Sequence, residues 1–184
     1  MKLLYATDAY HSQNASLAPP RRRRCQALGV IYERQDQMGA IARNTVAVVL
    51  GLVTGSLVNM GLIMMSGQVI PPPEGVDVMN TDSLRASMRL FQPKHFLFPF
   101  LAHALGTFVG GFVASMLAAT QKMKLALGVS AFFLLGGIVN VFLLPSPIWF
   151  TALDLIGAYI PMGWFAGKLA ASLRPESLKT RSSA

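Results

Sequence analysis

Two ionisable side chains stand inside apolar stretches of the sequence, where they could exchange a proton with each other. His103 opens the hexapeptide His-Ala-Leu-Gly-Thr-Phe, and Asp154 opens the similar hexapeptide Asp-Leu-Ile-Gly-Ala-Tyr. An aspartate next to a histidine favours the imidazolium, whereas a low dielectric constant disfavours either charge alone. The pair could therefore carry a proton, bind a cation or a small ligand, or share a structural hydrogen bond.

Two asparagines occupy comparable positions in two other apolar stretches, which completes a polar layer of Asn59, His103, Asn140 and Asp154. Counted inward from the outer end of each stretch, these residues lie roughly 6 to 10 Å deep, at 1.5 Å of helix per residue. Lipid exposure of an ionised group would cost about 2.5 to 3.5 kcal/mol. We therefore expect the four side chains to face one another, with the histidine and the aspartate within hydrogen-bonding or one-water distance. They form either a polar site or interhelical hydrogen bonds worth about 0.6 kcal/mol each.

The same residues argue against a metal centre, because one histidine and one aspartate leave a tetrahedral or octahedral shell short of protein ligands. Cys25 is the only cysteine in the sequence, so there is no disulfide framework and no cysteine-based metal motif. The sequence also contains no recognisable nucleophile and base motif and no phosphate-binding glycine loop. We assign no catalytic residue and expect no cofactor.

The composition places these residues in a membrane. Of 184 residues, 53% are hydrophobic and only 13% are charged, which is too little polar surface for a water-soluble domain of this size. The formal net charge is +8, but the basic residues lie outside the apolar runs apart from Lys168, and no aromatic residues alternate with them. We therefore expect the lipid bilayer to be the partner of this chain and expect no nucleic-acid binding.

Four apolar runs of 20 to 24 residues are long enough to cross the hydrocarbon core of a bilayer, about 30 Å thick. They cover residues 45–65, 96–119, 125–144 and 148–171. Helices buried in soluble proteins rarely run this long without a polar stripe. The sequence therefore predicts an all-α membrane protein, a four-helix transmembrane bundle over residues 44–171.

The segment before the first run is predicted to be a disordered basic tail over residues 1–43. Four consecutive arginines at 21–24 follow two prolines, and no apolar period accompanies them. Translation starting at Met38 is an alternative, in which case residues 1–37 would lie upstream of the true start.

The outer loop, residues 66–95, is predicted to contain a short amphipathic helix. Thr81-Asp82-Ser83 can cap it, and Leu84, Met88 and Phe91 then fall on one face. We expect this segment to lie over the outer side of the bundle, either as a lid or partner-docking strap or as a simple connector.

The basic residues also predict the orientation of the chain. They precede the first run, they occupy the second loop as Lys122 and Lys124, and they recur in the tail at 172–184, whereas the third loop has no charge. By the positive-inside rule, both termini are cytoplasmic in a multi-pass protein of the plasma membrane, the inner membrane of a bacterium.

Glycine and proline predict how the spans meet. The three Gly-x-x-x-Gly pairs are Gly51 and Gly55, Gly106 and Gly110, and Gly163 and Gly167. Each pair lets a neighbouring backbone come close, so we interpret them as helix-packing surfaces. Pro161 lies within the fourth run and should kink that helix, freeing a carbonyl about one turn earlier.

The two hexapeptides also suggest an internal duplication, since Val58-Asn59 pairs with Val139-Asn140 in the same alignment. The bundle would then consist of two tandem helical hairpins related by an axis along the membrane normal. Chance similarity is the alternative interpretation.

Four segments together resemble a family of small four-span bacterial inner-membrane proteins to which no activity is assigned. They are Gly-Ser-Leu-Val-Asn-Met-Gly at 55–61, Pro-Pro-Pro-Glu-Gly at 71–75, Gln-Pro-Lys-His-Phe at 92–96 and Leu153-Asp154. The resemblance covers residues 44–171 and excludes the N-terminal tail. It implies the membrane location and the four spans, and it carries over no mechanism.

These features favour a minimal transporter, or a transport or channel accessory component, with a polar site in the outer half of the bundle. A non-catalytic membrane scaffold or interaction protein is the alternative, and a membrane-embedded enzyme is the second alternative. Four helices enclose little volume, so a transport path would favour a homo-oligomer, whereas a scaffold needs only a membrane-protein partner.

Overall fold

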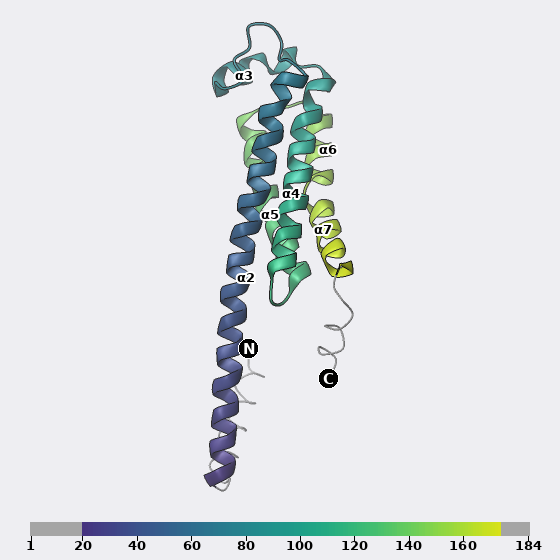
Figure 1. The fold of residues 1–184 in the computed structure, drawn as a ribbon. Coiled ribbons are helices and arrows are strands. Elements are labelled where there is room, and N and C mark those ends of the chain that lie inside the picture. Colours follow the sequence, from purple (N-terminus) through teal and green to yellow (C-terminus); the bar gives the residue numbers. More distant parts are fainter. Residues whose placement is uncertain (1–19, 174–184) are drawn as a thin grey trace. The chain divides into compact units, whose positions relative to one another are not determined.

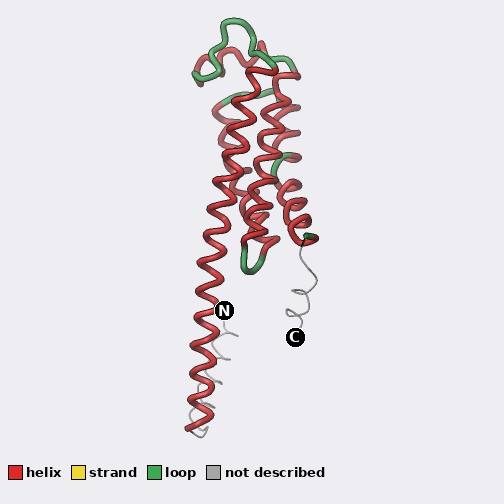
Figure 2. Tube along the Cα trace, in the orientation of Figure 1, coloured by secondary structure: helices red, strands yellow, loops and turns green. Residues whose placement is uncertain are grey.

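The computed structural model describes residues 20–173, with side chains from Arg34 onward. The chain divides into two compact units, residues 1–42 and 43–184. Figure 2 shows that the described residues form helices joined by loops, and no strand occurs between residues 20 and 173. The prediction of an all-α protein is confirmed.

The helices follow the chain in this order (Figure 1): α2 Pro20–Val69, α3 Thr81–Ser87, η1 Met88–Leu90, η2 Pro93–Phe96, α4 Leu97–Leu117, α5 Lys122–Leu143, α6 Ile148–Gly157 and α7 Ile160–Ser172. Four helical stretches are long and apolar enough to cross a membrane, and the fourth combines α6 with α7. The structure therefore has the four-helix bundle of a membrane-embedded protein. The duplication into two hairpins stays a prediction.

The expectation of a disordered tail is wrong for residues 20–43, because α2 begins at Pro20. Proline is tolerated at a helix start, where its missing N–H would be unpaired anyway. Between residues 26 and 43 the chain contains good helix formers such as alanine, leucine, glutamine and arginine. Extending the first span backward requires no new helix nucleus, so these residues can join it. The expectation for residues 1–19, and that for the tail after residue 173, lie outside the described residues.

In the second unit, α2 and α4 meet backbone to backbone. A Cβ atom added at Gly51 would lie 2.6 Å from the carbonyl oxygen of Gly110, and one added at Gly55 would lie 2.6 Å from that of Gly106. No side chain larger than a hydrogen atom fits there. The prediction that these two glycine pairs admit a neighbouring backbone is confirmed.

The third glycine pair lies on α7 and faces α5. A Cβ atom at Gly163 would overlap the Ser130 hydroxyl and lie 3.2 Å from the Ala126 carbonyl oxygen, whereas Gly167 faces the flexible side chain of Met123. Helices α4, α5 and α7 all pack against one another (Figure 1). Small residues therefore fill the junction of these three helices.

One end of the second unit, here called the basic end, contains Arg43, the turn at residues 118–121 and the end of α7. The Arg43 Nε–H donates to the carbonyl of Leu117 over 2.9 Å. The Asn44 amide donates to Thr120 Oγ1 and accepts from the Ala119 N–H, each over 2.9 Å. These bonds pair the last backbone groups of α4 and fix α2 to the turn that follows it.

The opposite end, here called the loop end, contains residues 70–96 and 144–147. Asn80 caps α3 there, since its Oδ1 accepts from the N–H groups of Asp82 and Ser83 at 2.9 and 3.1 Å. The cap predicted at residues 81–83 is therefore one residue too late. Asparagine is at least as good an N-cap as threonine, and its carbonyl reaches two orphan donors together.

The apolar face predicted for this loop is confirmed. Leu84, Met88 and Phe91 pack into one cluster with Phe96 and Phe150. The ring centroids of Phe96 and Phe150 lie 4.7 Å apart. His95 fixes the loop to α4. Its Nε2–H donates to the carbonyl of Pro71 over 3.1 Å, and its Nδ1 accepts from the Gln92 N–H over 3.0 Å.

The glycine crossing predicts the effect of a single methyl group. Gly55→Ala should lower the free energy of unfolding by about 1 to 3 kcal/mol, because the added Cβ must push α2 away from the backbone of α4. Gly61→Ala on the same helix is the matched control, since a Cβ there meets no atom within 4 Å. Thermal unfolding in detergent measures both variants. Equal unfolding temperatures would show that the crossing tolerates a wider helix spacing.

Candidate functional site

His103 and Asp154 meet inside the bundle, within the hydrogen-bonding distance that we expect from the sequence. His103 Nδ1 lies 2.9 Å from both carboxylate oxygens of Asp154. Helix α4 carries the histidine and α6 carries the aspartate, and each residue lies about 9 Å from the loop-end terminus of its helix, at 1.5 Å per residue. The side chains are 16% and 5% exposed, respectively, so the ion pair lies largely away from solvent and lipid.

The fourth span is broken rather than kinked, and Pro161 is the cause. Proline has no N–H to donate to residue 157 and its ring collides with that carbonyl, so α6 ends at Gly157. Helix α7 restarts at Ile160 with the proline in its first turn, where a missing N–H costs nothing. Tyr159 lies between the two helices with φ −114° and ψ −81°.

The break allows Tyr159 to join the pair. Its hydroxyl donates to Asp154 Oδ2 over 3.2 Å, although the two residues are only five positions apart. In an unbroken helix these side chains would point about 140° apart, at 3.6 residues per turn. The tyrosine ring also stacks on the imidazole of His103 at a centroid distance of 5.7 Å. We call these three residues the His–Asp–Tyr cluster.

Gly137 on α5 covers the tyrosine hydroxyl. A Cβ atom there would overlap that hydroxyl and lie 2.6 Å from the ring carbon Cζ of Tyr159. The absence of a side chain therefore lets the α5 backbone close over the hydroxyl while it faces Asp154. A Cβ atom added at the neighbouring Gly136 would meet no atom within 4 Å. Of the two adjacent glycines, only Gly137 therefore has this role.

The arrangement leaves one side of the imidazole unused. His103 Nδ1 is engaged by Asp154, whereas no residue in the described part of the chain hydrogen-bonds to Nε2. Nε2 is therefore the atom at which a further hydrogen-bonding group could meet the cluster.

The two asparagines do not join the cluster, so the expectation that all four polar residues face one another is wrong. Asn140 is exposed on α5. Asn59 lies half-buried where α2 crosses α4 at the glycine pairs. A Cβ atom added at Gly106 would be 3.0 Å from the Cβ of Asn59. Their depth in the sequence was comparable, but depth does not set the direction in which a helical side chain points.

Tyr159 is the site residue that sequence reasoning missed. It belonged to the second hexapeptide, opposite Phe108 in the first, and the two differ by the hydroxyl that now bonds Asp154. The sequence feature that could have indicated it is its position two residues before Pro161, where a proline interrupts the helix.

The cluster provides few ligands for a cation. Between residues 34 and 173, no three side chains of histidine, cysteine, aspartate or glutamate come together. A metal at Asp154 and His103 would therefore take its remaining ligands from water or from backbone carbonyls.

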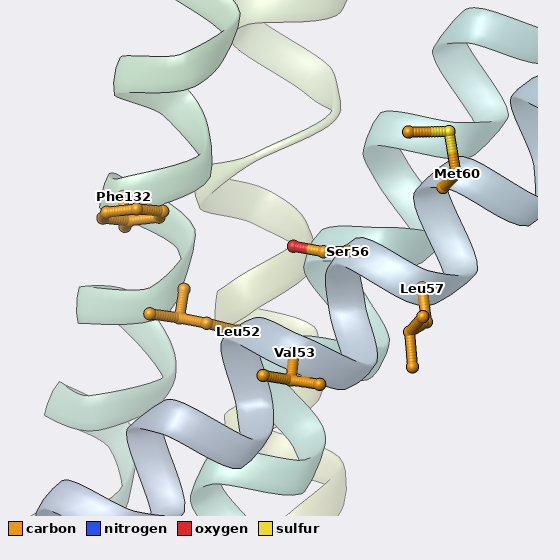
Figure 3. A pocket seen from close by; sticks show the side chains of 6 residues that line it. All are labelled: Leu52, Val53, Ser56, Leu57, Met60 and Phe132. Carbon is orange, nitrogen blue, oxygen red and sulfur yellow. The ribbon is translucent and has the colours of Figure 1, made fainter.

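A separate groove opens between α2 and α5 in the second unit (Figure 3). It has a volume of about 460 Å³ and is lined by Leu52, Val53, Ser56, Leu57, Met60 and Phe132. None of these side chains is ionisable, and all but Ser56 are apolar.

Comparison of the chain with protein-family models, with curated proteins and with solved structures found no match.

The close contact at Gly137 yields a prediction for the cluster. Gly137→Ala should displace the Tyr159 hydroxyl from Asp154 and lower the free energy of unfolding by about 1 to 3 kcal/mol. Gly136→Ala should leave it unchanged or raise it slightly. In a Tyr159→Phe background, Gly137→Ala should lower the free energy of unfolding by less, because the hydroxyl that the added methyl group would overlap is absent. Additive effects of the two substitutions in thermal unfolding would contradict this coupling.

Proposed function

We propose that this chain is a minimal transporter, or an accessory component of a transport or channel assembly, whose His–Asp–Tyr cluster carries a proton. The observation behind the proposal is the short contact of His103 Nδ1 with both oxygens of the buried Asp154 carboxylate. Ionisable residues within membrane spans are costly to bury and are commonly parts of proton or ion paths.

Proton exchange suits the cluster better than cation binding. A proton needs only an acceptor and a neighbouring donor, and His103 with Asp154 provides both. A cation would need several oxygen ligands, whereas the Asp154 carboxylate already accepts from His103 and from the Tyr159 hydroxyl. These two donors take up part of the acceptor capacity that a metal ion would use.

A transported proton must also cross the rest of the bilayer, and four helices enclose little volume. We therefore favour a homo-oligomer or a complex with another membrane protein. The alternative of a non-catalytic scaffold draws support from the groove between α2 and α5, whose apolar lining could receive a partner helix.

The proposed location is the plasma (inner) membrane of a bacterium, with both termini cytoplasmic. The basic end carries Arg43, Lys122, Lys124 and Lys168, and such residues are retained on the cytoplasmic side of spans. At the loop end, by contrast, Glu74, Asp77 and Asp82 balance Arg85, Arg89 and Lys94.

Reporter fusions test this orientation. A reporter that is active only in the cytoplasm, fused after Ala184, should be active, and the same reporter inserted after Glu74 in the outer loop should be inactive. The reverse pattern would overturn the orientation.

Proton movement tests the function. Purified protein is reconstituted in vesicles that contain a pH-sensitive dye, and a pH step is applied across the membrane. Asp154→Asn keeps the side-chain size but removes the charge, so it should abolish at least about nine-tenths of the proton flux, as loss of a relay group does. His103→Ala should act alike, whereas Asn140→Leu, outside the cluster, should retain the flux.

The outcomes separate a proton site from interhelical hydrogen bonding. Lost flux with a normal yield of folded protein supports the proton site. Unchanged flux in folded Asp154→Asn protein would refute it. A third outcome would assign the cluster to helix packing alone. In that case Asp154→Asn and His103→Ala give little folded protein, whereas Tyr159→Phe and His103→Gln fold and retain the proton flux of the wild type.

A further inference from the structure

Two lysines at the basic end have no counterion in the described part of the chain. Lys124 lies in the first turn of α5 and Lys168 in the second half of α7, and both side chains are exposed. Neither forms an ion pair with a carboxylate of residues 34–173. Charged side chains within membrane spans are ordinarily paired. Any counterion that these two lysines bind must therefore come from outside the described residues.

The other two basic residues of this end are engaged by α4. The Arg43 Nε–H donates to the carbonyl of Leu117 over 2.9 Å, and the Lys122 ammonium donates to that of Met116 over 3.5 Å. Both acceptors are among the last four carbonyls of α4, which have no partner within that helix. Arg43 and Lys122 thus help to pair the end of α4, whereas the first two lysines have no such role.

The packing of α5 against α7 brings Lys124 and Lys168 to one side of this helix pair. A Cβ atom added at Gly167 would lie 2.6 Å from Met123 Sδ, so these two residues face each other. Each lysine follows one of the facing residues by one position. Because the two helices are antiparallel (Figure 1), a step of about 100° on each helix turns toward the same side. With helix axes about 8 to 10 Å apart, both ammonium groups can reach a single anion.

A tryptophan and a glycine lie one turn toward the loop end on the same side. Trp164 precedes Lys168 by four residues and is 45% exposed, and the Lys168 ammonium lies 5.4 Å from its ring centroid. On α5, Gly128 follows Lys124 by four residues, and a Cβ atom there would meet no atom within 4 Å. Tryptophan is enriched at the level of lipid headgroups, where its ring borders both polar and apolar surroundings. The face therefore presents two ammonium groups next to an open apolar surface.

We propose that this face of α5 and α7 binds an anionic phospholipid of the leaflet at the basic end. Lys124 and Lys168 bind the phosphodiester through charge-assisted hydrogen bonds, and an acyl chain lies over Gly128 beside the Trp164 ring. Basic sites between transmembrane helices bind acidic headgroups in this way. A zwitterionic lipid is a poorer ligand, because its own ammonium group neutralises the phosphate. The inference does not depend on the proposed proton function.

Quenching of tryptophan fluorescence by brominated lipids tests the site in the full-length protein. The chain has two tryptophans, so Trp149→Phe leaves Trp164 as the reporter. Trp164→Phe leaves Trp149, which packs on Phe96 at the loop end. Each protein is reconstituted in phosphatidylcholine vesicles that contain increasing fractions of brominated phosphatidylglycerol or, in parallel, brominated phosphatidylcholine. The anionic lipid should bind at Trp164 at least about threefold more strongly than the zwitterionic lipid. Trp149 should show no such preference, and an equal preference at both tryptophans would overturn the site.

Removal of single charges separates these two lysines from the overall charge of the basic end. Lys124→Gln and Lys168→Gln should each reduce the preference at Trp164, and together they should abolish it. Lys122→Gln is the matched control, because it removes the same charge at the same end from a side chain that donates to an α4 carbonyl. It should retain the preference. An equal loss in this control, or no preference in the Trp149→Phe parent, would overturn the site.

Two further measurements define the ligand. Lys168→Arg keeps the positive charge, so it should retain the preference, and its loss in folded protein would contradict a site built on charge. Inorganic phosphate, added at constant ionic strength, distinguishes a lipid from a soluble phosphate. The preference for phosphatidylglycerol should persist in its presence. Its disappearance would assign the two lysines to a soluble phosphate compound and overturn the lipid site.

Discussion

The carboxylate of Asp154 lies inside an apolar bundle, where it persists only if hydrogen-bond donors reach it. His103 on α4 and Tyr159 at the break between α6 and α7 are those donors. Removing one partner from a buried ion pair typically costs about 3 to 5 kcal/mol, far more than an average interhelical hydrogen bond in a membrane protein, about 0.6 kcal/mol. The need to pair this one charge therefore sets the relative positions of α4, α6 and α7.

Glycines satisfy that constraint from outside the cluster. Gly137 allows the backbone of α5 to cover the tyrosine hydroxyl, and Gly106 and Gly110 allow α2 to approach α4 from another side. Because these contacts involve backbone rather than flexible side chains, they hold the helices at fixed spacings. The same small residues that pack the helices thus keep the donors within hydrogen-bonding distance of the carboxylate.

Much of this arrangement could be predicted from the sequence, because hydrophobic length, glycine spacing and the depth of a polar residue are one-dimensional properties. The four spans, the glycine crossing and the meeting of His103 with Asp154 depend on them. The direction of Asn140 depends on how a helix is rotated, which depth does not specify. The hydrogen bond of Tyr159 to Asp154 depends on the break between α6 and α7, because the two side chains would point in different directions in a continuous helix. The helix at residues 20–43 continues backward from the first span. The local composition of this segment, with its arginines and polar residues, did not indicate it.

The two directions along α4 from His103 differ in the side chains that they present. Toward the loop end, Phe96 and Phe100 fill the space with rings, whereas toward the basic end Thr107, Gly111 and Ser115 leave small or polar surfaces. The Phe100 ring packs against the loop-end cluster and also against the cluster of Ala104, Ala158 and Tyr159. Phe100 thus links the packing of the loop end to the packing around the His–Asp–Tyr cluster.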